Sequence, residues 1–508
     1  MAVHEPGAPD CRTVPDLVDR AAQEAPEAPA LLTADVALSY GDLARITRDL
    51  AAELKARGLE PGDRLLIVAE NDLASPVLML AAERVGAWPA ILNARVPAVE
   101  IAKLHNLIDP RLTVVTSDAG SEKSRAAMEG HDFAPLMIEG AGTVGCAVHA
   151  PGPADTTDPP AGDVALVLFS SGTTGIPKAV LHGHTGLLKL GETLRQVRQV
   201  CAGGRYDGGA PLSHVMGIST LMSVLAARAS LRLLPRLDIP DLAAQLAAGQ
   251  LTHLSYVPTV YTRLLDHIDH HGIDVSGHRL EYISSGGAPL DPTLKARVEA
   301  LFGTVLVNGY GMTECCPIAR TPPEPGAAPG YIGKAEPGSE MTVRRRDGTE
   351  AERGETGEIW ARAAATMLGY FRNPDATKAA MRPGGWVATG DLGSMDRRGG
   401  VTIAGRAKEM IIRSGFNVFP AEVEDVINSH PAVVQSAVFG KPAPNGDEYV
   451  VAVVQLRPGE TLTWGTLVQW LKERLAAYKV PHLIHFSPDL PIGPTGKILK
   501  RELARQFG

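Results

Sequence analysis

The residues best suited to phosphate chemistry stand together in one segment, SSGTTGIPK, which runs from Ser170 to Lys178. Glycines let the backbone come close to phosphate oxygens, hydroxyl groups can donate hydrogen bonds, and Lys178 supplies positive charge. The P-loop of NTPases requires Gly-Lys-Ser/Thr, whereas Lys178 follows Pro177, so an ordinary P-loop is excluded. Taken alone, the segment could also be a flexible surface turn rich in Ser, Thr and Gly.

Histidines are the other residue type whose chemistry could matter. His214 stands between apolar residues in PLSHVMG, where a lone histidine is usually a satisfied core residue. His182 and His184 form an H-x-H pair without an evident third ligand, so we expect them to be structural rather than metal-binding. Three more are expected on an exposed helix face: His267, His270 and His271.

The segments that must position these residues alternate between helix and strand patterns. Leu43, Ile46, Leu50 and Leu54 recur at helical spacing, and residues 64–69, which are apolar after Arg64, are typical of a buried strand. A further apolar run, VALVLF, leads directly into the segment that begins at Ser170. Strand and helix alternating at this rhythm predict an α/β fold with parallel sheets covered by helices. Because no G-x-G-x-x-G occurs, a dinucleotide-binding fold is excluded.

The chain changes character after Lys408. A short helix over 421–428, strands over 433–440 and 449–456, and a helix over 467–477 predict a compact α+β unit of about 100 residues. We therefore expect two domains: an N-terminal adenylation domain over residues 1–407, with several packed subdomains, and a small C-terminal lid over 408–508. Two Pro/Gly-rich stretches, 150–163 and 322–330, are expected to be surface loops.

Bulk composition limits the partners. The chain has 508 residues and a formal net charge of −8, which argues against nucleic acid as a main partner. It has no apolar run long enough for a membrane span and no secretory signal at its start. The five cysteines show no disulfide or metal spacing, and Cys315 and Cys316 are adjacent, so we expect a cytoplasmic protein. Composition leaves monomer and homodimer equally open.

Five motifs in the same order resemble the adenylate-forming superfamily, which contains acyl- and aryl-CoA synthetases, beetle luciferases and peptide-synthetase adenylation domains. The segment from Ser170 resembles that family's phosphate loop, and GYGMTE from Gly309 resembles its Y-G-x-T-E. The other three are W-x-x-T-G-D ending at Asp391, G-R-A-K ending at Lys408, and P-T-G-K ending at Lys497. The resemblance covers nearly the whole chain and implies an AMP-forming acid–thiol ligase that uses ATP, Mg²⁺ and coenzyme A.

The resemblance also implies roles in the nucleotide site. Glu314 is implied to bind Mg²⁺, Tyr310 to stack on adenine, and Asp391 to accept hydrogen bonds from the ribose hydroxyls. Lys497 is implied to stabilise the transition state of adenylation. The complete set implied for ATP or AMP is Ser170, Ser171, Gly172, Thr173, Thr174, Gly175, Lys178, Gly286, Gly287, Ala288, Asn308, Gly309, Tyr310, Gly311, Met312, Thr313, Asp391, Arg406 and Lys497. Thr313 and Glu314 are grouped with Lys497 and the hinge Lys408 as catalytic.

The acid is less well defined. The family position makes His214 a pocket residue rather than a core one, and the pocket is expected to comprise His214, Val215, Met216, Tyr256, Val257, Gly286, Gly309, Met312 and Cys315. Ligases for malonate-type diacids carry a cation before the Y-G motif, where this chain has Gly309. The expected acid is therefore a small-molecule monocarboxylate, either aromatic or short-to-medium aliphatic.

The second half-reaction needs a different arrangement of the same chain. The resemblance implies that the small domain rotates about Lys408 and that Ser414, Gly415 and Phe416 then border a tunnel for coenzyme A. Alternatives are an enzyme that loads a carrier-protein thiol, a luciferase-type oxygenase, and a non-catalytic ATP-binding member. Retention of both Lys408 and Lys497 favours an active enzyme over the last of these.

Overall fold

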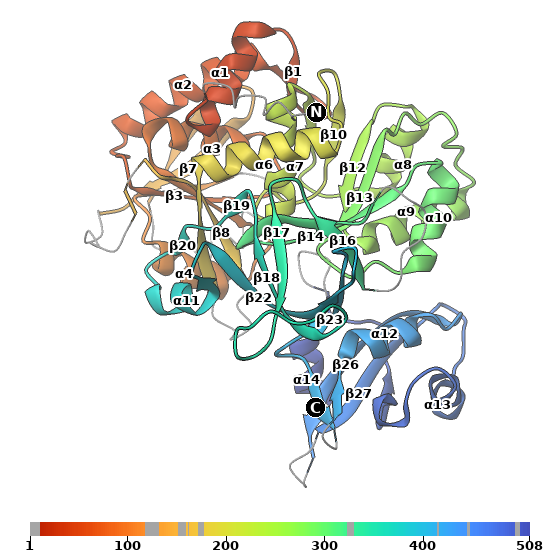
Figure 1. Ribbon diagram of the computed structural model, residues 1–508. Helices are drawn as coiled ribbons and strands as arrows, with labels where there is room; N and C mark the ends of the chain where they lie inside the picture. Colours follow the sequence, from red (N-terminus) through yellow and green to blue (C-terminus); the bar gives the residue numbers. More distant parts are fainter. Residues whose placement is uncertain are drawn as a thin grey trace, which may run out of the picture.

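The computed structural model describes residues 11–116, 132–150, 159–160, 162–170, 177–322, 330–413, 416–443, 448–492 and 498–507. Two mixed sheets with flanking helices make up the larger, N-terminal part, and a smaller α+β unit follows at the C-terminus (Figure 1). This confirms the expected α/β class with a small C-terminal domain. The division between residues 407 and 408 stays a prediction.

The largest sheet has the strand order β17-β18-β22-β23-β16-β15-β14-β13-β12-β10-β11-β1-β2, with β19 and β21 paired at its side. Its strands are β1 (Pro29–Leu32), β2 (Ala37–Ser39), β10 (Arg205–Gly208), β11 (Ser230–Leu233), β12 (His253–Tyr256), β13 (Tyr282–Gly286), β14 (Leu306–Met312), β15 (Cys315–Arg320), β16 (Tyr331–Ala335), β17 (Glu340–Arg344), β18 (Thr356–Arg362), β19 (Ala365–Thr366), β21 (Met381–Arg382), β22 (Trp386–Met395) and β23 (Val401–Arg406). Strands β10 to β14 are parallel, whereas β14 to β23 pair antiparallel. The parallel prediction therefore holds for only part of this sheet.

The second sheet has the order β20-β9-β8-β4-β3-β5-β7-β6. Its strands are β3 (Arg64–Ala69), β4 (Trp88–Asn93), β5 (Leu112–Val115), β6 (Phe133–Ile138), β7 (Gly142–Val148), β8 (Val164–Ser170), β9 (Lys178–Gly183) and β20 (Gly369–Tyr370). Strand β3 has the bounds expected from the sequence and every residue of it is buried, as a parallel strand covered on both faces requires.

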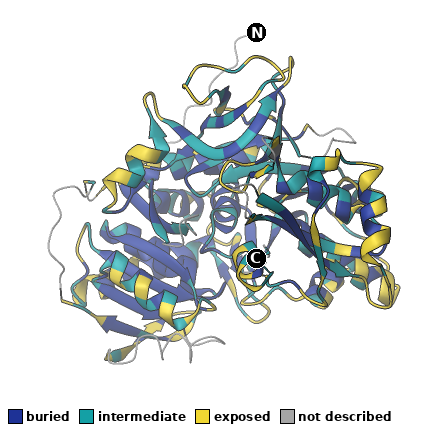
Figure 2. Cartoon of the chain, turned by 90° about the horizontal axis from the view of Figure 1, so that it is seen from below, coloured by how far each residue is buried: buried dark blue, intermediate teal, exposed yellow. Residues whose placement is uncertain are grey.

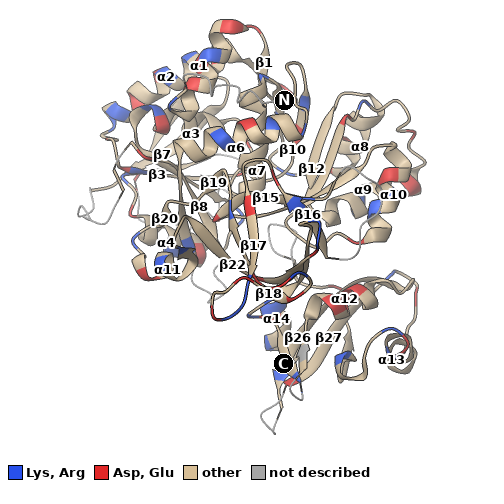
Figure 3. Ribbon diagram, in the orientation of Figure 1, with Lys and Arg blue, Asp and Glu red and all other residues tan. Residues whose placement is uncertain are grey.

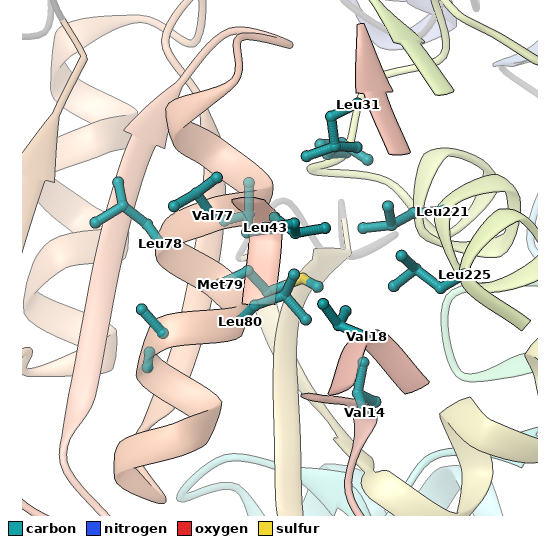
Figure 4. Close-up of a cluster of buried hydrophobic side chains, with 14 of the residues drawn as sticks. Val14, Val18, Leu31, Leu43, Val77, Leu78, Met79, Leu80, Leu221 and Leu225 are labelled. Atoms are coloured by element: carbon teal, nitrogen blue, oxygen red, sulfur yellow. The ribbon is translucent and has the colours of Figure 1, made fainter. Parts of the chain in front are cut away.

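Helices cover both sheets. They are α1 (Val14–Glu24), α2 (Tyr40–Ala56), α3 (Ala74–Val85), α4 (Ala98–Ile108), α6 (His184–Val197), α7 (Val215–Ala227), α8 (Ile239–Ala247), α9 (Pro258–His271), α10 (Pro292–Phe302) and α11 (Pro374–Ala380). Helix α2 contains the expected apolar stripe and begins where the Ser39 side chain accepts a hydrogen bond from the Asp42 amide. Its buried Leu43 meets side chains of α1, β1, α3 and α7 in the main core (Figure 4).

Burial follows these layers. In Figure 2 the strands are mostly buried, while exposed residues gather on loops and on the outward faces of the helices. His270 and His271 lie on the exposed side of α9, as expected. His182 and His184 are both buried, and the His184 Nδ1 accepts a hydrogen bond from the Val14 amide at 3.2 Å, which is a structural role.

The C-terminal unit consists of a β24–β25 hairpin, a three-stranded sheet and helices. Its elements are β24 (Ile411–Arg413), β25 (Phe416–Val418), α12 (Pro420–Asn428), β26 (Val433–Pro442), β27 (Glu448–Leu456), α13 (Trp464–Lys472), a 3₁₀ turn (Ala477–Lys479), β28 (Leu483–Phe486) and α14 (Lys500–Phe507). The expected helix over 467–477 is wrong at both ends. It starts earlier, where the Thr463 side chain accepts from the Thr466 amide, and it ends at Lys472. Ala476 has an extended backbone, so the helix could not have run on to residue 477.

Candidate active site

The segment expected to bind phosphate connects the two strands of one antiparallel hairpin. Ser170 ends β8 and pairs with Lys178, the first residue of β9. Ser171, Gly172, Thr173, Thr174 and Gly175 lie outside the described residues. The fixed pairing of Ser170 with Lys178 places the Lys178 ammonium at the base of the segment, where a cation can attract an anion.

Lys178 and Glu314 are joined through a residue that the sequence did not single out. The Tyr370 hydroxyl donates a hydrogen bond to Glu314 Oε1 at 2.9 Å, and the Lys178 Nζ lies 4.4 Å from the centre of the Tyr370 ring. Burial, together with the Glu314 carboxylate beside it, raises the pKa of the Tyr370 hydroxyl, which therefore stays a donor. Strand pairing explains the contact, because β20 pairs with β9 and places Tyr370 opposite Val180.

Glu314 occupies the turn between β14 and β15, one residue after Thr313. Its side chain is buried, and its carbonyl accepts a hydrogen bond from the Met367 amide at 2.9 Å. A single buried carboxylate suits Mg²⁺, which in phosphate-transfer sites is held by one or two carboxylates, by waters and by the substrate's own phosphates. Among the described residues no group of three or more His, Cys, Asp or Glu side chains could hold a metal by itself. The residues present thus fit a metal bound jointly with a nucleotide.

A second cluster joins Tyr310, Asp391 and Arg406. The Tyr310 hydroxyl donates to Asp391 Oδ2 at 2.5 Å, and the Arg406 Nε lies 3.2 Å from Asp391 Oδ1. Asp391 and Arg406 are directly paired across β22 and β23, so the sheet itself fixes this ion pair. Burial, with the Asp391 carboxylate next to it, raises the pKa of the Tyr310 hydroxyl well above its usual range. The motifs of Tyr310, Asp391 and Arg406 therefore meet in space, as expected.

A third group surrounds the end of β13. A Cβ on Gly286 would lie 3.0 Å from the Gly309 carbonyl oxygen and 3.5 Å from the methyl group of Met216. A Cβ on Gly287 would lie 3.6 Å from both Met216 and Val257. Asn308 and Gly309 stand beside Ser285 and Gly286 in the parallel pairing, and Ala288 follows in the next loop. The Gly309 carbonyl leaves little room for a side chain at Gly286, and Gly287 has φ of 76°, a conformation that favours glycine.

His214 and Val215 start helix α7, directly before Met216. His214 is the N-terminal capping residue, and both residues are partly buried, with Val215 packed against the main core. Met312 and Tyr310 pack together against the core between β15, β18 and β22. Gly311 lies on the other side of β14, where a Cβ would meet Cys316 Sγ at 3.2 Å.

Two residues of the expected acid pocket point elsewhere. Tyr256 pairs with Ser285 rather than Gly286, so its side chain lies on the opposite face of the sheet, where its hydroxyl donates to Asp207 at 2.5 Å. Cys315 is fully buried, with its sulfur 3.6 Å from Thr366 Oγ1, and burial raises its pKa to about 12. The adjacent Cys316, which alternates to the other face, is the cysteine that lies beside Gly311.

The remaining expected residues belong to the hinge and the C-terminal unit. Lys408 lies in the turn after β23 and is exposed. Phe416 is also exposed and stacks on Tyr478 with ring centres 4.6 Å apart. Ser414, Gly415 and Lys497 lie outside the described residues. Figure 1 shows α12 of this unit facing β23 of the N-terminal part, and Figure 3 shows acidic residues along the ribbon of α12.

Comparisons with known proteins agree with this geometry. The family model of the AMP-binding enzyme matches residues 18–371, and that of the AMP-binding enzyme C-terminal domain matches residues 422–497. The chain belongs to the AMP-binding enzyme family. It is an AMP-forming acid–CoA ligase that uses ATP, Mg²⁺ and coenzyme A.

Several relatives are similar over their whole length. A 3-[(3aS,4S,7aS)-7a-methyl-1,5-dioxo-octahydro-1H-inden-4-yl]propanoyl:CoA ligase of Rhodococcus jostii (strain RHA1) is 30% identical, covering 97% of this chain and 98% of that one. A feruloyl-CoA synthase of Amycolatopsis sp is 32% identical, over 96% and 98%. Among solved structures, ATP-bound MatB from Rhodopseudomonas palustris is 31% identical with a TM-score of 0.84, over 97% and 99%. No described helix of this AMP-forming ligase is long and apolar enough to cross a membrane.

Proposed function

We propose that the enzyme works in two steps on an aromatic or short-to-medium aliphatic monocarboxylic acid. In the first step a carboxylate oxygen attacks the α-phosphorus of ATP, the bond to the bridging oxygen breaks, and pyrophosphate leaves with the electron pair. In the second step the sulfur of coenzyme A attacks the acyl carbon, AMP leaves, and the thiol proton passes to solvent. The carrier-protein thiol remains the alternative acceptor.

The observation that carries this proposal is the meeting of three groups from distant segments. In the first group, Tyr370 contacts both Lys178 and Glu314. In the second group, Asp391 contacts both Tyr310 and Arg406. The third group is the corner around Gly286, where the ends of β13 and β14 lie side by side. A carboxylate and a nucleotide triphosphate repel each other, so a site that joins them must combine fixed cations with close backbone approach.

Each group has a proposed part in the first step. Lys178 attracts the phosphates, and Tyr310 provides a flat surface for adenine. Asp391 accepts hydrogen bonds from the ribose hydroxyls, oriented by Arg406. Glu314 and the phosphates would hold Mg²⁺, which supplies charge neutralisation at the phosphate oxygens. Met216, Val257 and Gly286 form an apolar surface against which the acid can lie.

The second step is proposed to use a rotated C-terminal unit. Lys497 serves adenylation, and rotation about Lys408 then replaces it with the segment around Phe416, which borders the thiol of coenzyme A. Water must be kept from the acyl-adenylate during this exchange, because that mixed anhydride hydrolyses readily. We place the reaction in the cytoplasm, since the described cysteines are free thiols.

The test is AMP release from ATP and Mg²⁺ with a panel of aryl, alicyclic and aliphatic monocarboxylic acids, each with and without coenzyme A. CoA-dependent AMP release with one class of acid would establish the reaction and identify that class. Pyrophosphate exchange without CoA turnover would replace coenzyme A by a carrier-protein thiol. No reaction with any acid of the panel would contradict the proposed substrate class.

A further inference from the structure

A column of small, mostly polar side chains runs between β13 and α7, away from Gly286. Successive residues of a strand point to opposite faces of its sheet. One face of β13 therefore carries Tyr282, Ser284 and Gly286. That face is the one covered by α7, because the Met216 methyl lies over Gly286. Ser255 belongs to the same face and its hydroxyl lies 2.8 Å from that of Ser284.

The other wall of the column comes from α7 and β15. Ser219 lies about one helical turn after Met216, and its hydroxyl is 3.6 Å from Cys316 Sγ. Gly311 lies on the far side of that sulfur. Met216 is unbranched and flexible, so it can move aside from the top of the column without disturbing the helix. The column therefore continues from the corner where the acid is proposed to bind.

An aromatic row forms the floor of the column. Tyr206, His253 and Tyr282 are aligned across β10, β12 and β13, with ring centres 4.9 Å and 6.3 Å apart. Tyr282 is four residues before Gly286, which on a strand corresponds to about 13 Å. The floor thus lies at a depth that suits an acid of intermediate size.

The Arg198 guanidinium lies at this floor. Arg198 follows α6, lies close to the Tyr206 hydroxyl, and interacts through its charge with Tyr282, Cys316 and the Glu336 carboxylate that it shares with Arg320. Its Nη1 is buried and makes no hydrogen bond in the described part of the chain, and the same holds for the hydroxyl of Tyr206, a fully buried residue. Apart from their contact with each other, these two buried groups have no hydrogen-bond partner among the described residues, which is unusual, since almost all buried polar groups are paired.

The charges around the floor do not cancel. Glu336 is buried, but its carboxylate lies 3.0 Å from the Nε of Arg320, which also donates to the Val197 carbonyl. Burial lowers the pKa of His253 to about 4 and raises that of the Cys316 thiol, so both are neutral. Arg198 has no ion pair among the described residues, which leaves one positive charge in excess. A positive charge in excess among buried neighbours is costly unless a ligand completes it.

We propose that the acid-binding pocket ends at Arg198 and Tyr206, and that the acid carries an oxygen acceptor, a carbonyl or a carboxylate, at the end remote from its reacting carboxyl group. This rests on the proposed function, because it assumes that the acid lies along the column below Gly286. An acid ending in a methyl group would leave both donors unpaired, and such mismatches discriminate more strongly than lost apolar contact.

The test uses three acids matched in length that end in a methyl group, a ketone or a carboxylate. The wild-type enzyme is expected to favour an oxygenated acid over the methyl-ended one by about 10–100-fold in kcat/KM, the range for a hydrogen bond to a charged group. The preference should disappear in Arg198→Met, mainly through KM, and return in part in Arg198→Lys. Arg195→Met is the matched control, because Arg195 lies on α6 in a partly exposed pair with Glu192.

Thermal stability separates a binding role from a structural one. A cation kept for a ligand should not stabilise the free enzyme, so Arg198→Met is expected to melt at the same temperature as wild type or higher. A lower melting temperature, with an equal loss of kcat/KM for all three acids, would overturn the proposal. Preference of the wild-type enzyme for the methyl-ended acid would overturn it as well.

Calorimetry distinguishes failure here from failure of the proposed function. If no acid supports CoA-dependent AMP release, the proposed function fails, and binding of the acids to wild type and Arg198→Met still decides the role of Arg198. If an oxygenated acid binds more tightly to the wild-type enzyme than to Arg198→Met, the proposed role of Arg198 is supported. Equal binding to the two proteins refutes that role. Preference for the carboxylate-ended acid would support Arg198 while correcting the monocarboxylate part of the proposed function.

Discussion

The Tyr370 hydroxyl donates a hydrogen bond to the Glu314 carboxylate, although the two residues are 56 positions apart in the chain. The same ring lies under the Lys178 ammonium. Tyr370 thus contacts both the cation at the base of the phosphate segment and the carboxylate expected to bind the metal. We propose that it is a positioning residue, which acts through Lys178 and Glu314.

Tyr370→Phe should therefore weaken the response to Mg²⁺ more than it weakens acid binding. Without the hydroxyl, the carboxylate loses a hydrogen bond of the kind worth about 1.5–3 kcal/mol and is no longer oriented. We expect the Mg²⁺ concentration for half-maximal AMP release to rise by roughly 10–100-fold, from titrations at fixed ATP. Tyr331→Phe, on the neighbouring β16, is the control. An unchanged Mg²⁺ titration would show that Tyr370 only packs.

Asp391→Asn should raise the KM for ATP. The carboxylate is held by Tyr310 and Arg406, and the amide would lose the charge that pairs with Arg406 and strengthens bonds from a diol. An increase of roughly 10–100-fold is expected from initial rates at varied ATP. Asp396→Asn is a suitable control, because Asp396 lies just after β22 and accepts only from the backbone amides of a turn. Similar KM values for ATP in the two variants would show that Asp391 does not bind the nucleotide.

Lys497→Ala should slow adenylation by about 10²–10³-fold, as removal of one electrostatic stabiliser does. The conversion of chemically prepared acyl-AMP to the CoA thioester should stay near the wild-type rate, because Lys497 is assigned to the first step only. Pyrophosphate exchange and single-turnover thioester formation measure the two steps separately. Lys472→Ala, at the last turn of α13, is the control. Near-normal pyrophosphate exchange in Lys497→Ala would refute the assignment.

Lys408→Pro should give the opposite pattern. Proline fixes φ near −65° and would prevent rotation of the chain at the turn after β23. Adenylation should remain measurable while thioester formation stops, whereas Lys408→Ala should keep both. Loss of both steps to the same extent in the proline variant would count against a hinge at this residue.

Asp425→Asn should stabilise the enzyme near neutral pH. Burial, followed by the carboxylates of Glu424, Asp291 and Glu422, raises the pKa of Asp425 to about 6, and Asp291 begins α10 in the N-terminal part. The folded protein thus holds this proton more tightly than the unfolded chain. The stability that protonation contributes is complete below the unfolded pKa near 4 and is lost as pH rises through about 6.

The two proteins should accordingly differ most at pH 7–8, on the order of 1–3 kcal/mol in favour of Asp425→Asn, and converge toward pH 4. Thermal unfolding between pH 4 and 8 measures the difference. Asp347→Asn should behave in the opposite way, because hydrogen bonds from the Thr349 side chain and backbone lower the pKa of Asp347. A constant difference between Asp425→Asn and wild type at every pH would exclude this explanation.

The residue types and the local elements that they form could be predicted from the amino-acid sequence alone. Residues 65–69 are apolar at every position and, with Arg64, form a strand buried on both faces, and the spacing of Leu43 and Leu50 placed α2 correctly. The motifs containing Lys178, Glu314 and Asp391 were recognisable because phosphate, metal and ribose each require particular atoms. These requirements fix the types of residue and their spacing, and both can be read from the amino-acid sequence.

Which side chains contact one another, in contrast, depends on how the strands and helices pack. Tyr370 lies in no motif that the sequence identified, and it reaches Glu314 because β20 pairs with β9 beside the β14–β15 turn. Cys315 and Tyr256 were expected in the pocket but lie on the wrong faces of their strands, since a shift of one residue reverses a side chain. The excess positive charge at Arg198 could not be predicted from the sequence, because burial and ion pairing depend on which strands and helices pack around a residue in the folded chain.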